Sequence, residues 1–144
     1  MRKPIGGSAL AAALGATVLL ATPAAAGDAV HIEAETPFEP GVSGTFESTL
    51  QGCETGAVDN GPARLAGSAR FGIFNGFKVF TCAGDEGGFV VRLHATFDET
   101  GSTGTWAIVD SWGSQAGLHG SGTLVGVPQG PDALLDIYDG TLRP

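Results

Sequence analysis

Basic residues are scarce in this sequence. Of its 144 residues only seven are Lys or Arg, against 15 Asp and Glu, and the formal net charge is −8. A chain this acidic, without a cluster of basic residues, is repelled by nucleic acid and by anionic membranes. We therefore expect neither of them as a partner. The basic residues beyond position 26 are scattered along the chain: Arg64, Arg70, Lys78, Arg92 and Arg143.

Long apolar runs are also missing after the first 26 residues, and no apolar stripe with the period of a helix follows them. The first 26 residues differ from the rest. Arg2 and Lys3 precede an apolar run over 9–21, and Ala24 to Ala26 end the segment with small residues. That order is typical of a cleaved secretory signal peptide, and the apolar run is too short and too rich in Ala and Gly to span a membrane well. We expect cleavage after Ala26, a single folded domain over 27–144, and secretion to the extracellular medium.

Cysteine is limited to two residues, Cys53 and Cys82. An even pair in an exported protein predicts a disulfide. The alternative, a catalytic thiol, requires a free thiolate beside a base. Pairing of the two cysteines leaves no thiol for that role.

Glycine is abundant, with 24 residues, and it separates short segments rich in Val, Ile, Phe, Thr and Leu. Several segments alternate in polarity with the period of a strand, most clearly over 89–97. Asn75-Gly76 is a strong signal for a hairpin turn, and Gly52 to Pro62 is interpreted as a loop. The predicted strands are about eight in number and lie near 29–36, 43–51, 64–74, 77–83, 88–98, 103–110, 117–127 and 133–142.

Short consecutive strands joined by tight turns favour an antiparallel meander. Eight such strands can close into a barrel, which leaves no sheet edge exposed. We therefore predict an all-β protein with an eight-stranded antiparallel barrel and one disulfide. A two-sheet β-sandwich is the alternative.

Polar side chains give few signs of catalysis. His31, Glu33 and Glu35 share a face of the first predicted strand and could converge on a metal, but a solvated strand face is the preferred interpretation. Arg92 and His94 share the face opposite the apolar side of their strand, which places them on the outer wall. No spacing indicates a zinc site, a cofactor or a serine nucleophile. Further candidates have no assembled partner: His119, Ser111, Ser114, Ser121, Asp110, Asp136 and Asp139.

Aromatic and aliphatic side chains must mostly fill the core of so small a domain. If the barrel retains a cavity, some of them line it and bind a small apolar ligand. The residues selected for that role are Phe89, Val91, Leu93, Phe97, Trp106 and Tyr138.

Three stretches carry a family resemblance: Gly104-Thr105-Trp106, Ala116 to Leu124 (AGLHGSGTL) and Tyr138-Asp139-Gly140. With Cys53, Cys82 and their neighbours they resemble a group of small secreted actinobacterial β-proteins. They are also similar to the repeating pattern of the allene oxide cyclase and dirigent-like barrel superfamily. The resemblance implies an eight-stranded antiparallel barrel with an apolar central cavity.

No motif in the chain matches the catalytic residues of a cyclase, and a shared fold does not carry activity. The favoured hypothesis is therefore non-catalytic binding of a small apolar ligand, or a structural or interaction role. The alternative is an enzyme of the cyclase or dirigent kind, which would orient an apolar substrate.

Overall fold

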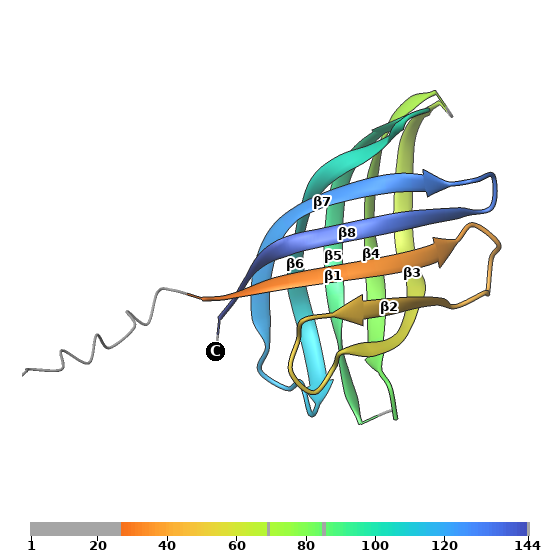
Figure 1. Cartoon of the computed structure of the whole chain (residues 1–144). Helices are drawn as coiled ribbons and strands as arrows, with labels where there is room; N and C mark the ends of the chain where they lie inside the picture. Colours follow the sequence, from red (N-terminus) through yellow and green to blue (C-terminus); the bar gives the residue numbers. More distant parts are fainter. Residues whose placement is uncertain (1–26, 69, 85, 144) are drawn as a thin grey trace, which may run out of the picture.

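The computed structural model describes residues 27–68, 70–84 and 86–143, and these residues are built from strands (Figure 1). The expected signal peptide over 1–26 lies outside the described residues. Within the described ranges, no helix is long and apolar enough to cross a membrane. The strands are β1 (Asp28–Pro37), β2 (Gly44–Ser48), β3 (Thr55–Ser68), β4 (Phe71–Cys82), β5 (Gly87–Asp98), β6 (Gly101–Gly113), β7 (His119–Gln129) and β8 (Ala133–Arg143).

The strands form a closed barrel in which each pairs with its neighbour in the sequence and β1 pairs with β8. All pairs are antiparallel. Ile32 on β1 shows the closure, because it lies opposite Ser48 on β2 and opposite Tyr138 on β8. The predicted fold class, an eight-stranded antiparallel barrel with one disulfide, is confirmed, and the sandwich alternative is wrong.

The alternating pattern of β5 determines which of its faces is buried. Phe89, Val91 and Leu93 point into the barrel and are at most 2% exposed, whereas Arg92 and His94 lie on the outer wall. The predicted alternation over 89–97 is therefore confirmed. A one-residue shift breaks the pairing with β6 beside Val90 and Val91, and such bulges increase the local bend that a barrel needs.

The predicted hairpin turn at Asn75-Gly76 is wrong. Asn75 pairs with Arg64 on one side and with His94 on the other, in the middle of β4. Gly76 is extended, not left-handed, and it is buried. A side chain there would start 2.8 Å from the Cβ of Ala63, so the glycine provides room where two strands pack closely.

The predicted loop over 52–62 is also mostly wrong, because β3 begins at Thr55. Gly and Pro made this stretch look irregular, but the β3–β4 pairing shifts register between Asn60 and Ala63. The bulge accommodates Gly61 and Pro62, since proline is tolerated in strands at such interruptions. The hairpin therefore turns between Ser68 and Phe71, about six residues earlier in the chain than predicted.

Aromatic rings fill one half of the barrel. The rings of Phe80 and Phe89 stack with centroids 4.8 Å apart, and Phe46 and Tyr138 meet the Phe80 ring edge-on at 5.1 and 5.5 Å. The indole of Trp106 packs against Tyr138 at 6.0 Å and donates a hydrogen bond to the Thr123 carbonyl. Offset and edge-on pairs of this kind stabilise a core beyond the effect of area alone.

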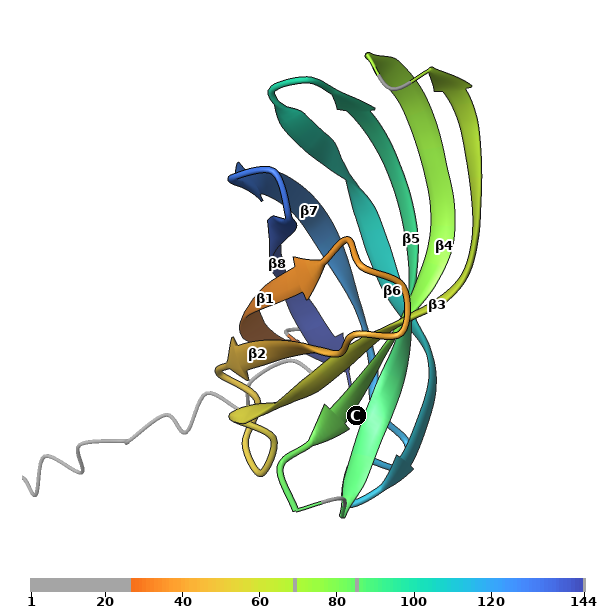
Figure 2. The same cartoon turned by 90° about the vertical axis from the view of Figure 1, so that its right-hand side faces the viewer.

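The disulfide between Cys53 and Cys82 lies at this filled end. It joins the β2–β3 turn to the end of β4, and both cysteines are at most 2% exposed. The predicted pairing is confirmed. At the opposite end, the β3–β4 and β5–β6 hairpins extend beyond the β7–β8 hairpin and the end of β1 (Figure 2). One end of the barrel is thus packed and linked covalently, while the other has a tall, uneven rim.

Candidate functional site

A cavity of about 710 Å³ occupies the half of the barrel that the aromatic rings leave unfilled. Its rim includes Phe38 after β1, Ser68 at the end of β3, Asp98 at the end of β5 and Pro128 near the end of β7. The volume lies within the range of about 300–1,000 Å³ that is typical of small-molecule sites.

Most of the cavity wall is apolar. Leu93 and Ala95 on β5, Leu124 on β7 and Leu134 on β8 line it, and Phe74 on β4 adds an aromatic ring. At this level of the barrel these strands present small or aliphatic side chains to the interior, and these side chains do not fill it. The wall can therefore accept a hydrocarbon chain or ring system from the open end.

The six residues that the sequence selected for ligand contact fall into two groups. Leu93 and Phe97 line the cavity. The other four are buried in the packed half, and each is at most 2% exposed: Phe89, Val91, Trp106 and Tyr138. Contact of any of them with a ligand stays a prediction.

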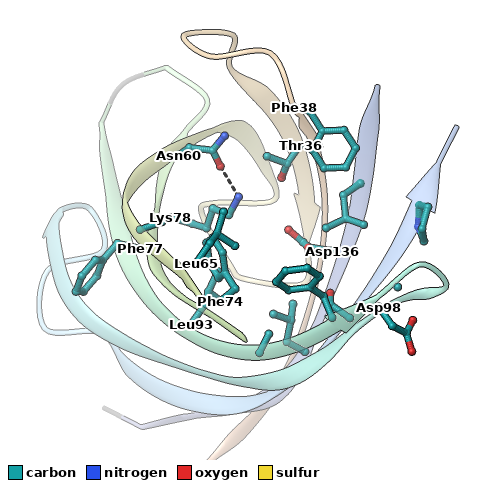
Figure 3. A pocket seen from close by; sticks show the side chains of 18 of the residues that line it. Thr36, Phe38, Asn60, Leu65, Phe74, Phe77, Lys78, Leu93, Asp98 and Asp136 are labelled. Carbon is teal, nitrogen blue, oxygen red and sulfur yellow. Dashed lines mark hydrogen bonds between the residues drawn. The ribbon is translucent and has the colours of Figure 1, made fainter. Parts of the chain in front are cut away.

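A buried lysine is the first of two charged groups inside the cavity. Lys78 extends from β4 next to the stacked Phe80, is 8% exposed, and donates a hydrogen bond to Oδ1 of Asn60 (Figure 3). Its ammonium also lies 6.0 Å from the centre of the Phe74 ring. Burial lowers the pKa of Lys78, and the negative charge of Asp136 partly offsets that effect.

Asp136 is the second charged group. It projects inward from β8, is 2% exposed, and is separated from Lys78 in the close view of the cavity (Figure 3). Burial raises the pKa of Asp136 to about 6, although the positive charge of Lys78 acts in the opposite direction. The Thr36 hydroxyl beside it also lowers the pKa of Asp136, but its geometry falls short of a hydrogen bond. Asp136 is therefore ionised above about pH 6 and neutral below it.

Two buried hydroxyl groups have no hydrogen-bond partner among the residues that the structure describes: those of Thr36 and Tyr138. Thr36 is 5% exposed and lines the cavity, whereas Tyr138 belongs to the packed layer below it. Burial raises the pKa of Tyr138 well above its usual value, so the phenol stays protonated. A buried hydroxyl without a partner costs about 1–3 kcal/mol, which a ligand or water at Thr36 would recover.

His31, the first metal candidate, lies on the outer wall. Its imidazole hydrogen-bonds Asp139 (Nδ1 to Oδ1, 2.5 Å) and Glu33 (Nε2 to Oε1, 3.1 Å). These bonds, that to Asp139 above all, raise the pKa of His31. Glu35 is exposed on the same face. In the described ranges, no group of three or more His, Cys, Asp or Glu could hold a metal ion.

The remaining polar candidates are spread over the surface. Arg92 and His94 are exposed on β5, and the His94 Nδ1 lies 2.5 Å from Oδ1 of Asn75. His119 and Asp110 are exposed on other strands. Ser111 accepts a hydrogen bond from the Leu118 amide and is half-buried, while Ser114 and Ser121 are exposed. Among Asp110, Asp136 and Asp139, only Asp136 points inward, so the structure does not bring these carboxylates together.

Sequence reasoning missed Lys78 as a functional candidate. The alternation places Lys78 on the same face as Phe80, but Phe77 and Val79 make the opposite face equally apolar. For Asp136 a signal existed: it shares a strand face with Tyr138 two residues later. Nothing in either pattern indicated that the two charges enter the same cavity from β4 and β8.

Comparison of the sequence with models of known protein families and with curated proteins gives no match.

Proposed function

We propose that this protein is a secreted binding protein whose barrel holds one small, mainly apolar molecule without transforming it. The observation that carries the proposal is the division of the barrel into a packed half and an open half. A fully structural barrel of this size gains stability by filling its interior, because a buried apolar void forfeits packing contacts. The large, mostly apolar cavity is instead suited to a ligand.

Secretion belongs to the same proposal. It is supported by the basic, apolar and small-residue order of the first 26 residues, and a disulfide is compatible with an oxidising compartment. Membership of the allene oxide cyclase and dirigent-like superfamily is likewise proposed from the Gly and aromatic motifs. A closed eight-stranded barrel is the fold that this resemblance implies.

Titration with the neutral apolar dye Nile red tests binding. We expect the fluorescence of the dye to rise and to saturate at one dye per barrel. In the Leu134→Trp variant, the new indole projects into the cavity, so dye binding should weaken by at least tenfold. Leu135→Trp is the matched control, because the neighbouring side chain lies on the opposite face of β8. Circular dichroism would verify that both variants fold.

Two outcomes would overturn the binding proposal. One is the absence of saturable dye binding to the wild-type protein. The other is equal binding by folded Leu134→Trp and Leu135→Trp, because the dye would then occupy a site outside the barrel. Ser102→Trp, which also enters the cavity from β6, provides a second blocking variant if Leu134→Trp does not fold.

One observation favours an enzyme of the cyclase or dirigent kind as the second candidate. Asp136 has a pKa of about 6 and lies inside the cavity, and a general acid or base works best with a pKa near the operating pH. Mass spectrometry of protein purified from its native culture medium would identify a retained compound. If wild-type protein converts that compound and Asp136→Asn does not, the enzyme candidate replaces simple binding; an unchanged compound supports binding.

A further inference from the structure

The charged groups in the cavity face each other without touching. Lys78 enters from β4 and Asp136 from β8, and the three ion pairs found among the described residues involve other side chains. Each charge nevertheless shifts the pKa of the other. The two groups are thus close enough to interact electrostatically and farther apart than an ion pair.

Both groups keep unused hydrogen-bonding capacity. An ammonium has three donors, and within the described part of the chain the Lys78 ammonium uses one of them, on Asn60. Within the described residues no hydrogen bond to the Asp136 carboxylate is found, and the Thr36 hydroxyl beside it is buried and unpartnered. The cavity therefore offers donors on one side and acceptors on the other, around an otherwise apolar volume.

We propose that the ligand is an amphipathic molecule whose polar end is an uncharged hydroxyl group, bound between Lys78 and Asp136. This inference rests on the proposed binding function and specifies its ligand. A hydroxyl oxygen accepts from the Lys78 ammonium while its hydrogen is donated to the Asp136 carboxylate. The apolar remainder of the ligand then lies along Leu93, Leu124 and Leu134 toward the rim.

The balance of charge disfavours the other common head groups. With Lys78 protonated and Asp136 ionised, the cavity holds one positive and one negative charge, because Asp98 at the rim points outward (Figure 3) and Tyr138 is neutral. A carboxylate or an amine between the two groups would be attracted by one of them and repelled by the other, so it gains little net Coulomb energy there. The loss of hydration of a charged head group is therefore not compensated, whereas an uncharged hydroxyl can bond to both groups without that cost.

An ether is disfavoured for a different reason. It accepts from Lys78 but has no hydrogen to donate, so the buried carboxylate stays unpaired. Loss of one hydrogen bond to a charged group costs about tenfold or more in affinity.

Displacement of Nile red at pH 8 tests the head-group assignment with matched probes of one chain length. The probes are 1-dodecanol, dodecanoic acid and dodecyl methyl ether. We expect 1-dodecanol to displace the dye at a concentration at least tenfold lower than either of the other two. Equal potency of the three probes, or preference for the acid, would overturn the assignment.

Two variants link this preference to the named residues. In Asp136→Asn the negative charge is gone, so dodecanoic acid should gain about tenfold and its disadvantage against the alcohol should nearly vanish. Asp139→Asn removes one charge from the outward face of the same strand. It should leave the ratio of the displacing concentrations of the acid and the alcohol unchanged. Lys78→Met should weaken 1-dodecanol by about tenfold, because the alcohol loses its charged donor. The proposal would be contradicted if the ratio of the displacing concentrations of dodecanoic acid and 1-dodecanol is the same in Asp136→Asn as in the wild type. It would also be contradicted if that ratio changes as much in Asp139→Asn.

Failures of the two proposals are distinguishable. If Nile red enters the barrel and Leu134→Trp blocks it, but the alcohol has no advantage, only the hydroxyl assignment is overturned. If the dye does not bind at all, both proposals are overturned.

Discussion

Replacement of Asp136 by Asn should stabilise the protein at pH 8. The pKa of Asp136 rises from its usual 3.8 to about 6 in the fold, and one pKa unit corresponds to about 1.4 kcal/mol. The ionised carboxylate therefore lowers the free energy of unfolding by about 3 kcal/mol at a pH well above 6. Asn resembles the protonated acid in shape and charge, so Asp136→Asn removes this penalty.

The direction of the pH dependence follows from the sign of the pKa change. Between about pH 4 and 6 the folded state holds a proton on Asp136 that the unfolded state has released, so the contribution of this group to stability falls as the pH rises. The advantage of Asp136→Asn over wild type should therefore shrink from about 3 kcal/mol at pH 8 to less than about 1 kcal/mol at pH 4.

Urea denaturation at pH 8, 6 and 4, followed by intrinsic tryptophan fluorescence, to which the buried Trp106 contributes, measures these differences. Asp132→Asn is the control, because Asp132 is exposed in the turn before β8 and surface changes are usually within about 0.5 kcal/mol. The reasoning is refuted if Asp136→Asn is less stable than wild type at pH 8, or if its advantage is the same at all three pH values.

Three further predictions concern the packed half and the outer wall. Replacing Cys53 and Cys82 by Ser should lower the free energy of unfolding by about 3–4 kcal/mol, because the bond closes a loop with a separation of 29 residues; a loss below about 1 kcal/mol in urea titrations would contradict this. Phe80→Leu should cost about 2 kcal/mol through its aromatic contacts, and at least twice as much as the outward Phe77→Leu in the same assay. His31→Gln should cost less than about 1 kcal/mol, since its ion pairs are solvent-exposed. Because the pKa of folded His31 is raised, that cost should appear below about pH 6.5 and vanish as the pH rises through the folded pKa; a loss that persists at pH 9 would exclude the charged-imidazole explanation.

The fold class could be predicted because two local signals agree with the tertiary structure. Alternation over β5 places Val91 and Leu93 on one face of the strand and Arg92 and His94 on the other. A barrel strand needs this division, because one of its faces is buried and the other faces solvent. The disulfide followed from the pairing of two cysteines in a predicted exported chain. Both signals depend on residue type and spacing alone.

The β3–β4 hairpin could not be placed because its local signals conflict with its tertiary contacts. Asn75-Gly76 has the composition of a turn, but pairing with strands on both sides holds it extended. Gly61 and Pro62 have the composition of a loop, but a bulge keeps them within a strand. Long-range pairing outweighs turn propensity at both places.

The candidate site was only partly predictable for a related reason. Leu93 and Phe97 were selected from the inward face of β5, and they line the cavity. Lys78 and Asp136 are 58 positions apart in the sequence, and their approach depends on barrel closure and on the level at which each strand crosses the interior. Those are properties of register, which no local pattern specifies.

The central claim, that the open half of the barrel is a binding site, is tested most directly by a crystal structure of the protein grown with 1-dodecanol. We predict one alcohol inside each barrel, with its hydroxyl oxygen within hydrogen-bond distance of the Lys78 ammonium and the Asp136 carboxylate and its chain directed toward the rim. A barrel whose interior holds only water while the alcohol lies on the outer wall would contradict the claim.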